Sequence, residues 1–317
     1  MTNSVAKHIA FVGHVSMDKV ENVNGVREQP GGAALYAAAA ARTLVEDVTL
    51  ITAIGRDFKY REILDLFDLR YVKFYDMPST RFHISYNDRW EAKYLKFDYG
   101  AGAKITSSIM KPKLIRENDA IHFSPMRASK LAKMIDIARK SSNDVKLSVN
   151  TWIGYITEGK KSRETLKEIS SNVDFFILND TESKLLAQTD SISSALRLLK
   201  AKMLIITLGE LGAVVSCSDG SRQLIPALTV PYGRVIDTTG AGDSWCGAFL
   251  AAYMLTEDIT KSVTFASIIS SIKCSGWGME HLLKLRFKDP DDAIEYVIGL
   301  REGRLQKRIF DYIDRKR

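Results

Sequence analysis

The stretch "DTTGAGDSWCGAF", residues 237–249, places small residues between two aspartates and then becomes apolar. The apolar part predicts a buried helix that carries Asp243 in its first turn. A helix N-terminus has unpaired N–H groups and about half a positive charge, and glycines there let the backbone approach an anion closely. The amides that we expect to point at one oxyanion are those of Gly240, Ala241, Gly242 and Asp243.

The carboxylate of Asp243 is poorly suited to bind a phosphate, because like charges repel each other. It suits a base that takes a proton from a hydroxyl while that hydroxyl attacks the phosphate. A second interpretation is that Asp243 only caps the helix, as aspartate often does. These residues alone leave both interpretations open.

Around this stretch, short apolar strands alternate with helical patterns along the chain. The alternation predicts an α/β fold with a mostly parallel sheet that helices cover on both faces. The strands are expected at 8–16, 47–55, 69–77, 120–125, 145–152, 173–180, 203–209 and 213–218, and two of the helices at 30–44 and 128–141.

Two segments, 20–29 and 81–99, interrupt this order because polar and apolar residues alternate along them and aromatic residues are frequent. Such segments predict exposed antiparallel strands with one dry and one wet face. An isolated small sheet is marginal in water, so one face must cover something. We expect these strands to form a lid over a substrate cleft, built from about residues 18–30 and 79–100.

The composition is that of a globular protein. The chain has 317 residues, 45% of them hydrophobic, and fits one large domain. No apolar run reaches about 18 residues, which argues against a transmembrane helix, and the first residues lack a signal-peptide pattern. We therefore expect a cytoplasmic protein whose three cysteines, Cys217, Cys246 and Cys274, are reduced.

The net charge of +7 is concentrated at the end of the chain, where residues 304–317 carry six basic and two acidic side chains. We expect a solvated helical tail there and no nucleic-acid partner. The overall positive field still favours an anionic ligand such as a nucleotide.

The pattern D-x-x-G-A-G-D should arise by chance in about one chain of this length in a few thousand. "DTTGAGDSWCGAFL", residues 237–250, resembles the C-terminal signature of the PfkB (ribokinase-like) family of sugar and nucleoside kinases. The resemblance implies a ribokinase-like three-layer α/β/α fold with a small β-strand lid, one kinase domain over residues 1–317, and ATP and Mg²⁺ as cofactors. In that family the GAGD loop holds the transferring phosphoryl group and its aspartate is the catalytic base. These roles fall on Gly240, Ala241, Gly242 and Asp243.

Further motifs follow in the order that the family has them. In "NDTE", Asn179 and Glu182 would place Mg²⁺ through water, and a helix capping box is the alternative. "TLGELGA", which begins at Thr207, resembles a hairpin whose turn contacts the nucleotide. The resemblance also allows a monovalent cation near Asp237 and Thr239. The nucleotide-binding residues that it implies are Asn179, Glu182, Thr207, Gly209, Gly212, Gly240 and Gly242.

The N-terminal half supplies the residues expected to face the acceptor. "GHVSMD" matches the family's glycine-x4-aspartate, in which the aspartate binds substrate hydroxyls. Four residues after "GG", many sugar kinases have an asparagine, and here Tyr36 stands in its place. This weakens an assignment as ribokinase or fructokinase, and either Tyr36 or Phe82 could stack on a nucleoside base. The residues expected to face the substrate are Asp18, Gly31, Gly32, Tyr36, Arg81, His83, Asn150 and Asp243.

The sequence thus predicts an ATP-dependent kinase that phosphorylates a hydroxyl of a small sugar or polyol. A nucleoside kinase of the same family is the main alternative, and a non-catalytic nucleotide- or sugar-binding protein is a distant one. We expect a small polyhydroxylated substrate, a homodimer through the lid as in relatives, and neither a nucleic acid nor a membrane as partner.

Other nucleotide and metal motifs fit poorly. "GYITEGKKS" (154–162) approximates a P-loop, but Lys161 stands where the Mg²⁺-binding hydroxyl belongs. "GHVSMD" after the first strand does not match the G-x-G-x-x-G of a Rossmann dehydrogenase. The five histidines lack the spacing of a zinc site.

Overall fold

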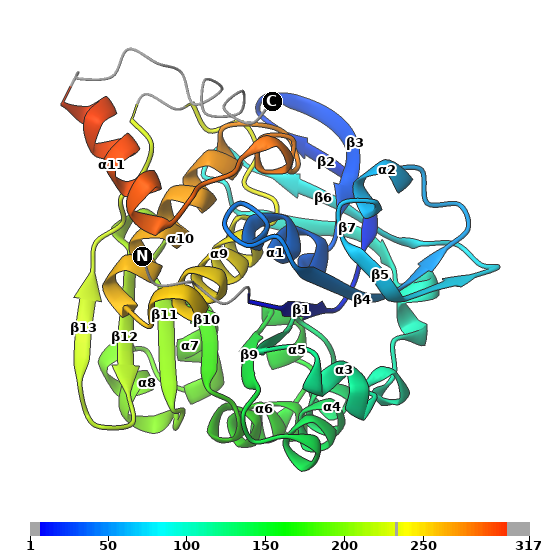
Figure 1. Cartoon of the computed structure of the whole chain (residues 1–317), viewed down its shortest axis with the longest axis horizontal. Coiled ribbons are helices and arrows are strands. Elements are labelled where there is room, and N and C mark those ends of the chain that lie inside the picture. The colour runs from blue at the N-terminus through cyan, green and yellow to red at the C-terminus, as the bar shows by residue number, and fades with distance from the viewer. Residues whose placement is uncertain (1–6, 232–233, 303–317) are drawn as a thin grey trace.

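A nine-stranded sheet runs through the middle of the computed structural model, which describes residues 7–231 and 234–302 (Figure 1). The strands are β1 (Ile9–Val12), β4 (Val48–Gly55), β5 (Asp68–Tyr75), β8 (Ala120–Phe123), β9 (Lys146–Asn150), β10 (Phe175–Asn179), β11 (Met203–Thr207), β12 (Ala213–Cys217) and β13 (Arg222–Ile225). Their spatial order is β13-β12-β11-β10-β9-β8-β1-β4-β5. Neighbours from β11 to β5 pair in parallel, and β12 and β13 extend one edge as antiparallel strands. The mostly parallel sheet is confirmed.

Helices cover both faces of this sheet (Figure 1). They are α1 (Ala33–Ala41), α2 (Arg61–Leu64), α3 (Pro112–Arg116), α4 (Ala128–Ser141), α5 (Ile153–Ile156), α6 (Lys160–Asn172), α7 (Asp180–Ala187), α8 (Ile192–Leu198), α9 (Ala241–Thr256), α10 (Ile259–Cys274) and α11 (Pro290–Arg301). Successive side chains of a strand point to opposite faces, so each face has its own apolar core. In β1, Ile9 and Phe11 pack with α1 and α9 to α11, whereas Ala10 and Val12 pack with α3 to α8. The predicted three-layer α/β/α fold is confirmed.

A second, four-stranded sheet stands beside the first and has the order β3-β2-β6-β7. Its strands are β2 (Ser16–Asn22), β3 (Gly25–Gly31), β6 (Thr80–Tyr86) and β7 (Ala92–Asp98). Two antiparallel hairpins, β2–β3 and β6–β7, meet through the parallel pair β2–β6. We call this sheet the lid.

The predicted bounds of the N-terminal elements are wrong in three places. The expected strand at 8–16 ends at Val12, and the chain then crosses into the lid with β2. The strand segment expected at 20–29 begins earlier, at Ser16, and consists of two strands, because a turn follows Asn22. The helix expected from residue 30 starts at Ala33, because Gly31 still pairs with Ser16 in the lid. Alternation of polarity gives the period of a strand but does not show where the strand changes sheets.

The position of α9 follows from its small residues. It packs between α1 and α10, and α1 has the sequence AALYAAAAA, in which short side chains let the two helices approach. α9 therefore starts at the edge of the sheet where the central strands end, below the lid (Figure 1). Within the described residues, no helix is long and apolar enough to cross a bilayer. The tail predicted at 304–317 lies outside the described residues.

Candidate active site

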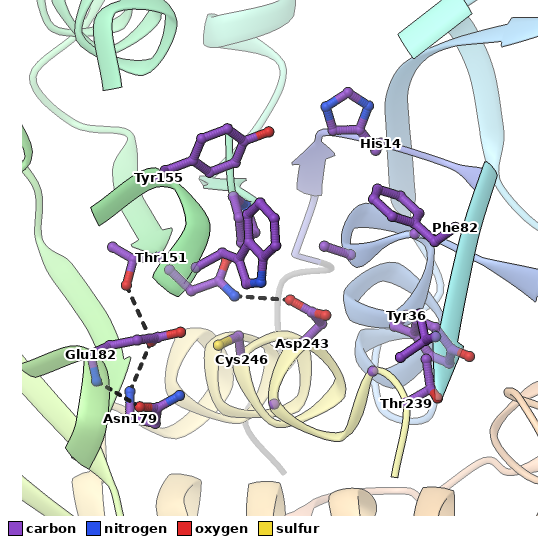
Figure 2. Close-up of a pocket in the computed structure, with 18 of the residues that line it drawn as sticks. His14, Tyr36, Phe82, Thr151, Tyr155, Asn179, Glu182, Thr239, Asp243 and Cys246 are labelled. Carbon is purple, nitrogen blue, oxygen red and sulfur yellow. Dashed lines mark hydrogen bonds between the residues drawn. The ribbon is translucent and has the colours of Figure 1, made fainter. Parts of the chain in front are cut away.

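A cavity of about 240 Å³ lies between the lid and the carboxyl ends of β9, β10 and β11. Open α/β sheets commonly bind ligands at this edge. Its polar wall contains Asp18, Asn150, Glu182 and Asp243. Its aromatic lining comes from both the lid and the body of the protein, and consists of His14, Tyr36, Phe82, Tyr86, Tyr94, Tyr99, Trp152 and Tyr155. Figure 2 shows the labelled members of both groups around the start of α9.

Residues 237–243 comprise a turn and the first three residues of α9. We call this segment the 237–243 loop, and it needs glycine at Gly240. Gly240 adopts the left-handed conformation with φ 73° just before the helix. A Cβ atom on Gly240 would lie 2.3 Å from the ring of Tyr36. Ala241 donates its N–H to the carbonyl of Thr238 at 3.1 Å, so this amide serves the loop itself. The amides of Gly242 and Asp243 belong to a first turn that lacks acceptors within the helix.

Asp243 has one hydrogen-bond partner in the cavity. Asn150, at the end of β9, donates its Nδ2 to Asp243 Oδ1 at 2.9 Å (Figure 2). Desolvation by the surrounding protein raises the pKa of Asp243 to about 6, and the hydrogen bond from Asn150 opposes this rise. The carboxylate thus titrates close to neutral pH, as a proton acceptor at this pH should.

The capping box expected as the alternative for "NDTE" is present at the start of α7. Asn179 Oδ1 accepts the N–H of Glu182 at 2.8 Å, and Glu182 Oε2 accepts the N–H of Asn179 at 3.1 Å. The hydroxyl of Thr151 also donates to Glu182 Oε2, at 3.2 Å (Figure 2). Burial raises the pKa of Glu182 to about 7, and the charge of Asp243 adds to the rise. Capping does not remove Asn179 and Glu182 from the cavity, since both line it.

These residues fit a magnesium ion only through water or phosphate. Mg²⁺ prefers oxygen ligands and usually keeps several waters, and the cavity offers carboxylate and amide oxygens. Among the described residues, no three His, Cys, Asp or Glu side chains gather in a way that could hold a metal directly.

Asp18 and the glycine pair, which the sequence predicts to face the acceptor, lie together in the structure. Asp18 is in β2, its carboxylate lies against Gly31, and a Cβ on Gly31 would come within 1.8 Å of Asp18 Oδ2. Gly32 precedes α1 and lines the cavity beside Asp18. Burial raises the pKa of Asp18 to about 7, and the charge of Asp237 contributes to the rise. Glycine at position 31 is therefore what gives this carboxylate its space.

Tyr36 lies beneath the 237–243 loop and is 1% exposed. Gln29 Nε2 lies 3.3 Å from the Tyr36 hydroxyl, and the Lys273 ammonium lies 5.6 Å from the centre of its ring. The ring supports Gly240, which leaves no room to stack on a base. Phe82, the second aromatic residue proposed for stacking, faces the cavity from the lid (Figure 2).

Asp237, at the start of the same loop, is fully buried and has many partners. Its Oδ2 accepts from Gln29 Nε2 at 2.9 Å and from the N–H of Gly278 at 3.0 Å, and its Oδ1 accepts the N–H of Thr239 at 2.8 Å. Lys273 Nζ lies 3.2 Å from Oδ2 and donates to the Asp237 carbonyl at 2.6 Å. Burial tends to raise the pKa of Asp237, but the Lys273 charge and these hydrogen bonds hold it below its usual value.

The hairpin β2–β3 of the lid is attached to the segment that precedes this loop. Asn22 Nδ2 donates to the carbonyl of Ile236 at 3.0 Å. Asn24 Nδ2 donates to the same carbonyl at 3.0 Å and to that of Val235 at 3.1 Å. Together with Gln29, these side chains join the lid to the start of the 237–243 loop.

Three predicted substrate residues do not line this cavity, namely Gly31, Arg81 and His83. Arg81 pairs with Asp57 at 2.7 Å, and His83 Nε2 lies 2.7 Å from Glu21 Oε1. Both are on β6, but they line a separate hollow on the opposite side of the lid from the main cavity. The strand period places Arg81 and His83 on the face opposite Ile84, which lines the main cavity.

On the nucleotide side, Thr207 lines the cavity at the end of β11, in register with Asn179. Gly209 and Gly212 flank a short 3₁₀ turn that follows it and are not part of the cavity lining. The rejected P-loop segment is also separate from the cavity, since Lys160 begins α6 and pairs with Glu164 at 3.7 Å on the surface.

Sequence reasoning missed Lys273, Gln29 and most of the aromatic lining. The signal for Lys273 was a lysine within the otherwise apolar and small "SIISSIKC" of α10. For Trp152 and Tyr155 the signal was two aromatic residues directly after Asn150, at the carboxyl end of a parallel strand.

Known proteins resemble this chain along most of its length. A sequence profile described as pfkB family carbohydrate kinase matches residues 6–283. Cytidine kinase of Thermococcus kodakarensis is 30% identical over 254 residues, covering 77% of this chain and 88% of the relative. Nucleoside kinase of Methanocaldococcus jannaschii is 27% identical over 273 residues, covering 80% and 85%. Ribokinase of Lactococcus lactis is 27% identical over 300 residues, covering 86% and 92%.

Solved structures share the fold. Burkholderia thailandensis nucleoside kinase in complex with inosine superposes with a TM-score of 0.75 at 20% identity, covering 94% of this chain and 97% of that one. The large mostly parallel sheet and the small lid sheet of this chain thus belong to a ribokinase-like fold.

Proposed function

We propose that this chain, which belongs to the pfkB family of carbohydrate kinases, phosphorylates a hydroxyl of a nucleoside. Membership of the family makes the chain an ATP-dependent kinase with a small-molecule acceptor and a typical requirement for Mg²⁺. The sequence alone favoured a sugar or polyol and placed the nucleoside second. The relatives and the cavity support the reverse order.

The aromatic wall of the cavity carries this proposal. Trp152 lies between Tyr94 of the lid and Tyr155 of α5, with ring centres 5.1 and 5.3 Å away. Phe82 contributes a further ring from β6. A free sugar offers hydroxyl groups that need polar partners, whereas a base offers a flat apolar face that stacks on such rings. The wall is therefore better suited to a base than to a sugar alone.

The polar wall suits the ribose of the same molecule. We assign Asp18 to binding of ribose hydroxyls, beside Gly31 and Gly32, whose lack of side chains lets the acceptor approach. Asp243 and Asn150 line the same cavity, and we place the hydroxyl to be phosphorylated next to Asp243.

In the proposed reaction the acceptor oxygen forms a bond to the γ-phosphorus of ATP while the bond from phosphorus to the bridging oxygen breaks. The acceptor's proton passes to Asp243, and ADP leaves with the bridging oxygen. The free amides at the start of α9, those of Gly242 and Asp243, would stabilise the charge on the transferring group. Ala241 would act through the shape of the loop, since its amide is already bonded within it.

Asn179 and Glu182 would hold Mg²⁺ through water, and the ion would neutralise phosphate charge. Thr207 lines the same end of the cavity and is proposed to contact the nucleotide, with the turn at Gly209 and Gly212 at its outer edge.

A panel of acceptors tests the proposal. Purified chain with ATP and Mg²⁺ is offered cytidine, uridine, adenosine, inosine, ribose, fructose and inositol, and ADP release is measured. We expect kcat/KM for the best nucleoside to exceed that for every free sugar by about 100-fold or more. A free sugar or inositol that outperforms all nucleosides would overturn the assignment in favour of the sugar kinase suggested by the Lactococcus lactis relative.

The variant Trp152→Leu sharpens this test. Loss of a stacking ring should raise KM for the nucleoside by an amount equivalent to about 1–3 kcal/mol, with little change in any residual turnover of ribose. Trp90→Leu is the control, because Trp90 contacts Tyr86 at the tip of the lid and does not line the cavity.

A homodimer through the lid also remains a proposal. β7 is the edge strand of the lid and is exposed along its whole length, with Leu95 and Phe97 about half exposed. A second lid could cover this edge. A monomeric mass by sedimentation at micromolar concentration would reject the dimer.

A further inference from the structure

A buried ammonium group, that of Lys273, contacts the start of the 237–243 loop, and the proposed reaction does not use it directly. Lys273 comes from the last turn of α10, and its side chain is completely buried. Its ammonium contacts both the main-chain carbonyl and the carboxylate of Asp237, at 2.6 and 3.2 Å. The face of the Tyr36 ring lies on another side, 5.6 Å away. Tyr36 in turn supports Gly240, so the cation and the anion-binding turn share one side chain.

This arrangement conflicts with the monovalent cation that the family resemblance allows near Asp237 and Thr239. A bound potassium or sodium ion needs several oxygen ligands, and Asp237 would have to supply some of them. Its Oδ2 already accepts from Gln29, Gly278 and Lys273, and its carbonyl accepts from Lys273. A second cation beside a buried ammonium would also be repelled strongly in this low-dielectric region.

We propose that the Lys273 ammonium takes the place of a free monovalent cation and makes this kinase independent of potassium and sodium. Lys273 acts as a positioning residue, because it touches neither acceptor nor nucleotide. It fixes Asp237 at the start of the loop and, through Tyr36, the turn at Gly240. The inference rests on the kinase activity of the family but not on the identity of the acceptor.

The first experiment uses the unmodified chain in a buffer whose only monovalent cation is tetramethylammonium. ADP and ATP affinities are measured by calorimetry, which needs no acceptor, and turnover is measured with the best acceptor available. Addition of about 100 mM KCl or NaCl, against the same concentration of tetramethylammonium chloride, should change both quantities by less than about twofold. Activation or tighter nucleotide binding by roughly tenfold in KCl alone would overturn the proposal.

The second experiment removes the built-in cation. Lys273→Ala should lose turnover by about 100-fold, because the loop is no longer held in place. Potassium, ammonium or methylammonium ions should then increase the turnover of the variant by at least about tenfold and raise its midpoint of thermal unfolding, whereas tetramethylammonium should do neither. A general loss of stability would not respond selectively to small cations, so an Ala variant with unaltered turnover, or with a loss that no small cation relieves, would count against the proposal.

Lys261→Ala is the matched control. Lys261 is on the same helix, but it is exposed and pairs with Asp291 at the surface at 2.7 Å. Its removal should produce neither the loss nor the response to cations. If Lys273→Ala fails to fold in any salt, the cation response of the unmodified chain still decides the question. Failure of every acceptor in the panel would leave the calorimetric result intact, so the two proposals fail separately.

Discussion

Asp237 and Asp243 stand at the two ends of one loop, and their surroundings differ in almost every respect. Asp237 is fully buried, accepts hydrogen bonds from Gln29, Gly278 and Thr239, and pairs with Lys273. Asp243 faces the cavity with a single hydrogen bond from a side chain. The pKa of Asp237 is held below its usual value, whereas desolvation raises that of Asp243 to about 6.

The difference lies in the number of positive and polar partners that each carboxylate has. A buried carboxylate remains charged when a cation and several N–H groups surround it. A carboxylate that is desolvated without a cation becomes a better proton acceptor. One loop thus combines a permanent charge that holds structure with a titrating group suited to proton transfer, and three substitutions test this division.

The largest effect is expected for Asp243→Asn. Asparagine keeps the size of the side chain but cannot accept the proton, and Asp243 makes no capping hydrogen bond to α9 that the change could remove. We expect kcat to fall by roughly 10²–10⁴-fold, with ATP affinity from calorimetry nearly unchanged. Asp258→Asn is the control, since Asp258 caps α10 by accepting the N–H of Lys261. If the two variants lost similar, small amounts of turnover, Asp243 would not be the base.

Asp237→Asn should act on stability. It leaves the Lys273 ammonium buried without an opposite charge, and the free energy of unfolding should drop by about 3–5 kcal/mol in urea denaturation. The double variant Asp237→Asn with Lys273→Met should recover much of that loss, because the unpaired charge is then gone. Asp291→Asn, which breaks the exposed pair between Lys261 of α10 and Asp291 of α11, should change stability by no more than about 0.5 kcal/mol. Equal losses in the two single variants would contradict a structural charge at Asp237.

The smallest of the three effects is a shift in the pH profile of Asn150→Ala. The base works when deprotonated, so kcat/KM should fall as pH drops through the pKa of Asp243 near 6. Asn150 stabilises the charged form, and its removal should move this acidic limb upward by roughly one pH unit. Asp18 and Glu182, whose pKa values are about 7, are present in both proteins, so the difference between the two profiles is measured and not the position of either limb alone. Asn118→Ala is the control, because Asn118 bonds to the carbonyl of Leu114 and does not line the cavity. If the acidic limb of Asn150→Ala stays in place, Asn150 does not influence the protonation of the base.

The sequence predicted the fold and the 237–243 loop because both are written in local patterns. Apolar strands alternating with helices specify layers, and a glycine-rich turn before an apolar helix needs no distant partner to be recognised. The same holds for Asn179 and Glu182, which are three residues apart on one helical turn.

What the sequence could not show depends on contacts between distant residues. Lys273 is 36 positions from Asp237, and nothing in α10 names its partner. The alternation in β6 separates Phe82 and Ile84 from Arg81 and His83, but it does not say which set faces the cavity. The apolar set does, since it can pack on the body of the protein. Arg81 and His83, proposed for the substrate, lie on the opposite face for the same reason.

The attachment of hairpin β2–β3 to residues 235–237 has a thermodynamic consequence. Asn22, Asn24 and Gln29 join a strand pair that carries Asp18 to the start of the 237–243 loop, which we propose to bind the phosphate. Hairpin β2–β3 and residues 235–237 are thus joined directly by side-chain hydrogen bonds, and hairpin β6–β7 is joined to them through the parallel pair β2–β6. Any change of ATP affinity on acceptor binding must then be matched by an equal change of acceptor affinity on ATP binding, because the coupling free energy has one value. The double variant with Asn22→Ala and Asn24→Ala should reduce this coupling free energy. The reduction should be the same whether it is measured as the effect of the acceptor on ATP affinity or as the effect of ATP on acceptor affinity.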